Sequence, residues 1–416
     1  MQKNRIMLSF LSETARVSKG TSTAILATLT FTREKVKIRC KSLILLLLTG
    51  CVTGPGGRKD PPVYLDLQCT PFSLAGDELD LTRLEVLEGT RPALFGVGRK
   101  RNTRPLAFYL PFTDEDELGQ ENRRAVEWSP GTRFLAGSPL AQRHLALLEV
   151  VMGNARRLEI RDMPGNITRS TGATFAGSLE DPVVRHVAGS WWVAYKDGAS
   201  AMAMADSPWQ MLQVSGEPTL VSRPVKGVSI PERPVLLPRA SGVRVVWPDP
   251  AGRTFTSRII GPGGAAAPVT LPVKPVGGME SFQAFGRGEA LYLAWVEGDS
   301  LLGEARLRLA LIRGNRLAWD KTYALEDIQA GPPVIAGRSG LAWVMLPVFR
   351  AGKGWLNLYR LDAREGVYRG RRGPLAEGTN PTTGFFGAEN TGVFLILQNP
   401  QRSLKRHSLC RARVPG

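Results

Sequence analysis

Pro182-Val-Val-Arg-His-Val-Ala-Gly-Ser-Trp-Trp-Val-Ala-Tyr195 is the clearest copy of a pattern that recurs along the chain. It starts with a proline, continues as a short apolar segment, turns at a glycine and ends in an aromatic-rich apolar segment. Short apolar runs bounded by Gly and Pro are typical of β-strands joined by tight turns. Helical periodicity is weak elsewhere, with residues 76–87 and 114–125 as exceptions, so the sequence predicts an all-β fold.

The pattern returns at a nearly constant interval. The aromatic markers of five copies are spaced by 55, 48, 48 and 51 residues: Trp192, Trp247, Trp295, Trp343 and Phe394. Weaker copies precede them at Ala93–Val97 and His144–Leu148. A period of about 40–50 residues, with about four strands per unit, is typical of a β-propeller. The sequence therefore predicts a propeller of about seven four-stranded blades, with six to eight as the range.

The recurring aromatic rings are predicted to pack between blades, because each blade buries its faces against the next. A ligand platform is the alternative role for the same rings. Two stacked β-sandwiches are the alternative fold, but they would not produce a near-constant period. No motif assigns a propeller family: Trp319-Asp320 is a lone dipeptide of the WD-repeat kind, and Asp249–Phe255 is similar to the Asp-box of sialidase-type propellers with one residue too many.

A second feature lies upstream of the repeats. Lys35, Lys37, Arg39 and Lys41 run into the apolar segment Leu43–Leu48, which meets Thr49-Gly50-Cys51. This is the order of an export signal, and the apolar run is shorter than the roughly 20 residues of a membrane-spanning helix. A Leu-rich core segment is the alternative interpretation.

The ending Leu48-Thr49-Gly50-Cys51 resembles the lipobox of bacterial lipoproteins. The resemblance implies diacylation of the Cys51 thiol, cleavage before Cys51 and acylation of the new amino terminus, with palmitate as a typical acyl group. Residues 1–50 are then a signal peptide with a spurious N-terminal extension, since initiation at Val36 would give a compact signal. Residues 51–62 are a lipidated Gly/Pro tether, and residues 63–416 are the propeller.

The location expected from this resemblance is the cell envelope. Val52 stands where enteric sorting rules place Asp in lipoproteins retained at the inner membrane, so the resemblance implies a lipid anchor in the outer membrane. The formal net charge is +17, of which residues 1–50 carry +7. Nucleic acid is the usual partner of a basic domain, but an exported chain rarely meets it. Anionic lipid head groups are the alternative neighbour for Arg99–Arg101 and Arg369–Arg372, and solvated loops are the default interpretation of both clusters.

Two cysteines remain in the predicted mature chain, Cys69 and Cys410. An even pair in an oxidising compartment predicts a disulfide, and two separate thiols are the alternative. If the strand holding Cys69 completes the last blade beside the strand holding Cys410, the bridge would lock the ring.

Four carboxylates form the candidate site: Glu180, Asp181, Glu232 and Glu280. Each lies at the start of a predicted innermost strand, so three successive blades would present carboxylates at one mouth of the tunnel. Such groups could act as general acid and base on a glycan, or bind a cation. Acidic residues are also common in polar turns before strands.

No other motif indicates chemistry. The three histidines lack partners at metal-ligand spacing, and the sequence has neither a Gly-x-Ser-x-Gly elbow nor a phosphate-binding Gly-Lys-Ser/Thr loop. We therefore expect no cofactor and no metal. The leading hypothesis is a non-enzymatic binding or scaffold lipoprotein with a protein or glycan partner. The alternatives are a carbohydrate-active hydrolase or lyase that uses the carboxylates, and a component of a secretion or assembly complex.

Overall fold

The chain divides into two units, Met1–Pro61 and Pro62–Gly416, and the second contains every residue described in the computed structural model. The predicted signal, Cys51 and the tether lie outside the described residues. The structure describes residues 63–64, 67–72, 80–87, 93–99, 105–111, 124–128, 131–140, 143–153, 155–163, 168–175, 178–198, 207–215, 220–249, 253–276, 279–298, 305–325, 329–338, 341–350, 353–361, 367–375, 380–386, 392–398 and 407–413.

Every named element among these residues is a strand, and the strands form seven separate sheets, here called blades 1 to 7. Blades 1 to 3 have four strands each, in chain order from inside to outside. Blade 1 contains β3 (Asp80–Leu87), β4 (Ala93–Arg99), β5 (Pro105–Pro111) and β6 (Arg124–Glu127). Blade 2 contains β7 (Thr132–Leu140), β8 (Arg143–Met152), β9 (Ala155–Met163) and β10 (Thr168–Phe175). Blade 3 contains β11 (Leu179–Val187), β12 (Ser190–Asp197), β13 (Gln210–Ser215) and β14 (Val221–Pro224).

The later blades repeat this order. Blade 4 contains β15 (Val235–Arg239), β16 (Gly242–Pro248), β17 (Phe255–Gly261), β18 (Gly264–Ala265) and β19 (Val269–Thr270). Blade 5 contains β20 (Met279–Arg287), β21 (Ala290–Glu297), β22 (Arg306–Arg313) and β23 (Arg316–Ala324). Blade 6 contains β24 (Gln329–Ala330), β25 (Val334–Arg338), β26 (Leu341–Arg350), β27 (Lys353–Leu361), β28 (Val367–Leu375) and β1 (Val63–Tyr64). Blade 7 contains β29 (Asn380–Phe386), β30 (Gly392–Gln398), β31 (His407–Arg413) and β2 (Leu67–Phe72).

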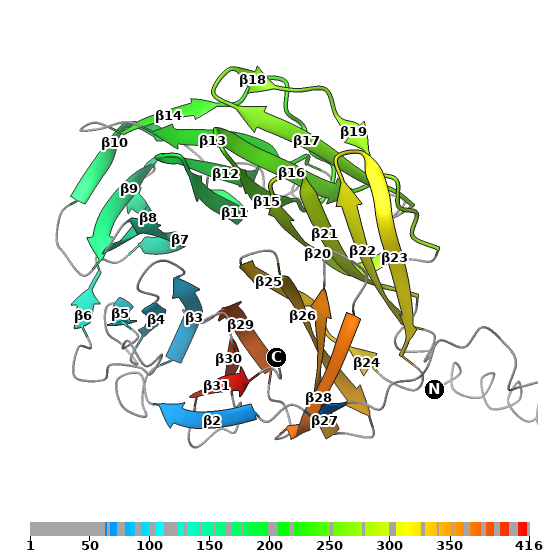
Figure 1. Cartoon of the computed structure of the whole chain (residues 1–416). Coiled ribbons are helices and arrows are strands. Elements are labelled where there is room, and N and C mark those ends of the chain that lie inside the picture. The colour runs from blue at the N-terminus through cyan, green and yellow to red at the C-terminus, as the bar shows by residue number, and fades with distance from the viewer. Residues whose placement is uncertain are drawn as a thin grey trace, which may run out of the picture. The chain divides into compact units, whose positions relative to one another are not determined.

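The seven blades form a ring through their innermost strands. Each of these strands contacts the next, and the last contacts the first, in the order β3, β7, β11, β15, β20, β25, β29 (Figure 1). The predicted all-β propeller with seven blades is confirmed. The helical periodicity over residues 76–87 was misleading, because Asp80–Leu87 is the inner strand of blade 1. No helix among the described residues has the length and hydropathy needed to cross a bilayer.

The blades pack against one another through apolar clusters, as the recurring aromatic residues predicted. Each marker residue, from Trp192 to Phe394, lies on the second strand of its blade. Trp192 and Trp247 share one cluster between blades 3 and 4, and Trp295 lies in the next, between blades 4 and 5. Trp192, Trp295 and Trp343 are at most 2% exposed. Truncation of such a buried ring to alanine lowers the stability of the fold by about 3–5 kcal/mol. The need to fill the space between neighbouring blades therefore accounts for the recurrence of an aromatic residue in each repeat.

The N-terminal strand β2 completes blade 7. It pairs antiparallel with β31 (Figure 1). In the register of this pair, Cys69 lies directly opposite Cys410. Directly opposed residues of an antiparallel pair have Cα atoms about 4.5–5.5 Å apart, which is within the range of disulfides. The predicted pairing of the two strands is therefore confirmed, and the disulfide itself stays a prediction.

The inner strands of blades 2 to 6 run in the same direction. Asp181 near the start of β11 contacts Arg233, which precedes β15. At the other end, Ser138 near the end of β7 bonds His186 near the end of β11, at 2.8 Å between Oγ and Nδ1. We call the end at which these strands begin the acidic end, because it holds the candidate carboxylates.

Candidate functional sites at the two ends and in the blades

The acidic end brings together residues from neighbouring blades. Glu180 and Asp181 lie in β11, where the register with β12 shifts between Glu180 and Val183, and Asp181 has a φ of +44°. Glu232 is half-buried just before β15. Glu280 lies in β20 at a second register shift, between Met279, which is opposite Glu297, and Ser281, which is opposite Val296. Each predicted carboxylate is thus at the start of an inner strand.

Two of these carboxylates have polar partners within the protein. The Arg233 guanidinium donates through Nε to Asp181 Oδ2 at 3.0 Å and through Nη2 to Oδ1 at 3.2 Å. The Glu180 carboxylate accepts a hydrogen bond from the Ser178 hydroxyl. The Asp181–Arg233 pair joins blades 3 and 4, and both side chains are more than half exposed, so its contribution to stability is about 0–1 kcal/mol.

Among the described residues, no group of three or more His, Cys, Asp or Glu side chains could hold a metal ion. The Asp249 carboxylate instead organises its own turn, since Oδ1 accepts from the Arg253 backbone N–H at 2.8 Å and Oδ2 from the Thr254 hydroxyl at 2.9 Å.

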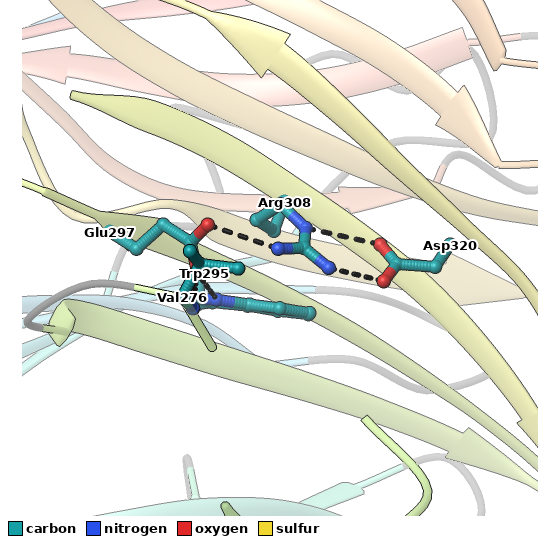
Figure 2. Close-up of polar contacts among 5 residues, drawn as sticks. All are labelled: Val276, Trp295, Glu297, Arg308 and Asp320. Atoms are coloured by element: carbon teal, nitrogen blue, oxygen red, sulfur yellow. Dashed lines mark hydrogen bonds and ion pairs between the residues drawn. The ribbon is translucent and has the colours of Figure 1, made fainter. Parts of the chain in front are cut away.

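A charged cluster that sequence reasoning missed lies inside blade 5. The Arg308 guanidinium of β22 lies between Glu297 of β21 and Asp320 of β23 (Figure 2). Arg308 Nη1 donates to Glu297 Oε1 at 3.0 Å, and Nε donates to Asp320 Oδ1 at 3.2 Å. The same guanidinium lies 5.2 Å from the ring centre of Trp295, within the range of a cation–π contact. The cluster therefore ties three strands of one blade together.

The second oxygen of Glu297 is also occupied. Glu297 Oε2 accepts hydrogen bonds from the indole of Trp295 at 3.0 Å and from the backbone N–H of Val276 at 3.1 Å (Figure 2). Val276 belongs to the connection from blade 4 to blade 5. Glu297 is 2% exposed, and a buried carboxylate is tolerated because these donors replace water.

The electrostatics of Arg308 fit a structural role. Burial alone would lower its pKa, but hydrogen bonds and the charges of Asp320 and Glu297 outweigh burial and raise the pKa above the ordinary value. The guanidinium stays charged, and its donors are used within the blade. The cluster therefore holds neighbouring strands together, which is a structural role rather than a catalytic one.

Blade 2 contains a similar buried carboxylate. Glu149 of β8 is fully buried, and its Oε1 accepts from the backbone N–H of Leu179 at 3.1 Å. Arg133 Nη2 lies 2.5 Å from Glu149 Oε2, and Arg156 Nη1 lies 3.6 Å from Oε1. Leu179 begins the inner strand of blade 3. Glu149 and Glu297 thus both hold a backbone N–H beside an inter-blade connection, and their position near the end of an apolar second strand is the sequence signal that could have identified them.

Two histidines, His144 and His186, also link blades. Tyr109 of blade 1 and His144 of blade 2 form a hydrogen bond of 2.8 Å between Oη and Nδ1. His186 bonds Ser138, as described above, and burial lowers the pKa of His186 below its ordinary value.

Comparison with known proteins supports the fold. No protein-family model matches the chain, and no curated protein matches it. Many solved structures resemble it, including the following three. The β-propeller domain of the trilobed protease from Pyrococcus furiosus, described as having an open velcro topology, is 11% identical with a TM-score of 0.50, and the match covers 81% of this chain and 94% of that one. Prolyl oligopeptidase B from Galerina marginata is 9% identical with a TM-score of 0.49 and coverages of 82% and 51%, so this chain spans about half its length. A subtype N10 neuraminidase-like protein of A/little yellow-shouldered bat/Guatemala is 12% identical with a TM-score of 0.43 and coverages of 84% and 98%. At this identity, the Pyrococcus furiosus likeness establishes the β-propeller fold of the chain and no activity.

Proposed function

We propose that this chain is a lipid-anchored protein of the bacterial cell envelope whose propeller binds a protein or glycan without catalysis. The observation that carries the binding role is the Asp181–Arg233 pair at the acidic end. A general acid or base must be able to exchange a proton with a substrate, whereas both Asp181 oxygens accept hydrogen bonds from one arginine. An exposed bidentate pair can serve in recognition, since its polar groups can rearrange onto a partner's charged groups.

The anchor is supported by the lipobox and by the position of the N-terminal strands. Leu48-Thr49-Gly50-Cys51 precedes β1 by a short Gly/Pro segment, so an acylated Cys51 would leave the whole ring in the mature protein. Two or more acyl chains give stable membrane attachment. Intact mass spectrometry of the protein purified from a bacterial host should show acylated Cys51 at the amino terminus. An unmodified Cys51 in a chain that retains residues before it would contradict the anchor.

A carbohydrate-active hydrolase or lyase is the second candidate. It is favoured by one observation: Glu180, Asp181 and Glu232 lie at the same end of adjacent blades, where paired carboxylates could flank a glycosidic bond. Release of reducing ends from envelope polysaccharides by the purified protein would test it. Glu232→Gln and Glu280→Gln should abolish that release if the carboxylates are catalytic, and we expect no release from the unaltered protein.

The binding role is tested separately with glycans and envelope extracts immobilised on a sensor surface. Arg233→Gln should weaken binding, because it removes one half of the exposed pair. Arg253→Gln is the matched control, since Arg253 is an exposed arginine at the same end of the ring whose backbone N–H, not its side chain, is bonded to Asp249. Equal binding by the Arg233 variant and the control would contradict a binding site at the Asp181–Arg233 pair.

A further inference from the structure

Arginine occupies the same structural position in three consecutive blades. Arg239, Arg287 and Arg338 are the last residues of the inner strands β15, β20 and β25. Each pairs with the first residue of the second strand of its blade. These three positions lie at the end of the ring opposite the acidic end, because the inner strands run in the same direction.

Further arginines join this end in blade 5. The backbone N–H of Gly314 donates to the Glu289 carbonyl at 3.2 Å, which holds the β22–β23 turn against the β20–β21 turn. The β22–β23 turn carries Arg313 and Arg316, which pair directly and are both exposed. The four turns at residues 239–242, 287–290, 313–316 and 338–341 contain five arginines and one acidic residue, Glu289. We call these five residues the arginine end: Arg239, Arg287, Arg313, Arg316 and Arg338.

The charge of Arg239 also affects a neighbouring arginine, Arg244. Arg239 Nη1 donates to the backbone carbonyl of Gly288, so its side chain reaches from blade 4 to the turn of blade 5. Arg244 of β16 donates from Nε to the Ser257 hydroxyl at 2.9 Å. Burial and the nearby charge of Arg239 lower the pKa of Arg244, and Glu289 only partly opposes them. An anion placed at this end would relieve the repulsion.

The N-terminal strand enters the ring from the same end. β1 pairs parallel with β28, with Val63 opposite Gly370 and Tyr64 opposite Arg371. β28 runs opposite to the inner strand β25, because three antiparallel pairings separate them. Val63 therefore lies nearer the arginine end than Tyr64 does. The segment between Cys51 and Val63 can span at most about 40 Å.

We propose that the arginine end docks on an anionic lipid surface, so that the ring rests on the membrane with its acidic end turned away. The membrane as occupant rests on the proposed anchor at Cys51, which would hold this end within reach of the lipid head groups. Phosphate head groups suit arginine, whose planar fork forms two parallel hydrogen bonds to such anions. Several arginines spread over three blades fit a continuous charged surface better than a single small anion.

Vesicle partitioning tests the proposal with the full chain carrying Cys51→Ser, which cannot be acylated. The probes are vesicles of phosphatidylcholine alone and of an equimolar mixture with phosphatidylglycerol, at low and high salt. We expect stronger partitioning onto the anionic vesicles, and loss of the difference at high salt because surface charges are screened. Each arginine near an anionic surface strengthens partitioning by about fivefold, so Arg239→Gln with Arg287→Gln should weaken it by about 30-fold.

The matched control removes two exposed arginines from the opposite end, through Arg253→Gln with Arg306→Gln. It has the same net charge and the same N-terminal basic segment, and it should weaken partitioning by less than about threefold. Equal losses in the two double variants would overturn the proposal, as would equal partitioning of the parent onto both kinds of vesicle. Binding to soluble alginate without partitioning onto anionic vesicles would also overturn it in favour of an acidic polysaccharide. Because Cys51 is absent from every variant, failure of this test is distinct from failure of the anchor, which mass spectrometry decides.

Discussion

Removal of either cysteine of the Cys69/Cys410 pair is the sharpest test of how the ring is closed. β2 is the fourth strand of blade 7 and comes from the opposite end of the chain from β31, so a bond between them would close a loop that spans nearly the whole folded part. The loop-entropy relation gives about 5 kcal/mol for such a bridge, as an upper value. At about 2 cal/mol/K per residue of unfolding entropy, this corresponds to a fall in Tm of about 7 °C.

The assay is thermal unfolding of the oxidised full chain with and without reductant, together with thiol counting under denaturing conditions. Cys69→Ser, Cys410→Ser and the double variant should all lower Tm by the same amount, because each removes the one bond, so the two single effects are not additive. Reductant should lower the Tm of the parent to that of the variants and leave the variants unchanged. Free thiols at both positions in protein isolated without reductant, or single effects that sum in the double variant, would refute the bridge.

Three further outcomes follow from the described contacts. Arg308→Gln leaves two carboxylates without their cation and should lower the free energy of unfolding by about 3–5 kcal/mol in denaturant titration, whereas the exposed Arg306→Gln should change it by less than about 0.5 kcal/mol. Burial lowers the pKa of His186 from an ordinary 6.5, so His186 takes up a proton in the unfolded chain at a higher pH than in the folded chain. The contribution of neutral His186 to folding stability is therefore complete above pH 6.5 and is lost as the pH falls below 6.5. His186→Gln should flatten that part of the Tm–pH curve. A Cβ at Gly337 would overlap the ring of Phe285 on the neighbouring inner strand, so Gly337→Ala should lower the free energy of unfolding by about 1–3 kcal/mol in thermal melts. Adding Phe285→Leu to the same chain should recover part of this loss of stability. Strictly additive losses in the double variant would contradict the contact.

The fold was predictable because each blade buries the same kind of side chain at the same place. Trp192, Trp247, Trp295 and Trp343 recur at the spacing of one blade, since each second strand must fill the space between two sheets. The pairing of β2 with β31 was predictable from the two terminal cysteines. The extra strands of blades 4 and 6 could not be predicted from the sequence, because β18, β19, β24 and β1 are only two residues long and have no periodicity of their own.

The candidate carboxylates were predictable in position but not in their partners. The turn before an inner strand can be located from the repeat, which placed Asp181 and Glu232 at one end. The pairing of Asp181 with Arg233 depends on the positive φ of Asp181 and the register shift in β11, and neither has a pattern in the sequence. The Arg308 cluster was hidden for another reason. Its three charged members lie on three successive strands, and only the register of those strands brings them together.

The arginine end shows how a repeat can carry information that single motifs do not. Arg239, Arg287 and Arg338 stand in unremarkable turns, and each alone would be taken for a solvated residue. Aligned by blade, they occupy one register position three times in succession, with Arg313 and Arg316 beside the middle copy. Arg287 is exposed, and an exposed arginine adds little to stability, whereas Arg239 also bonds the Gly288 carbonyl of the next blade. The shared property of the three positions is therefore their charge at one end of the ring, and this is the property that the paired double variants test.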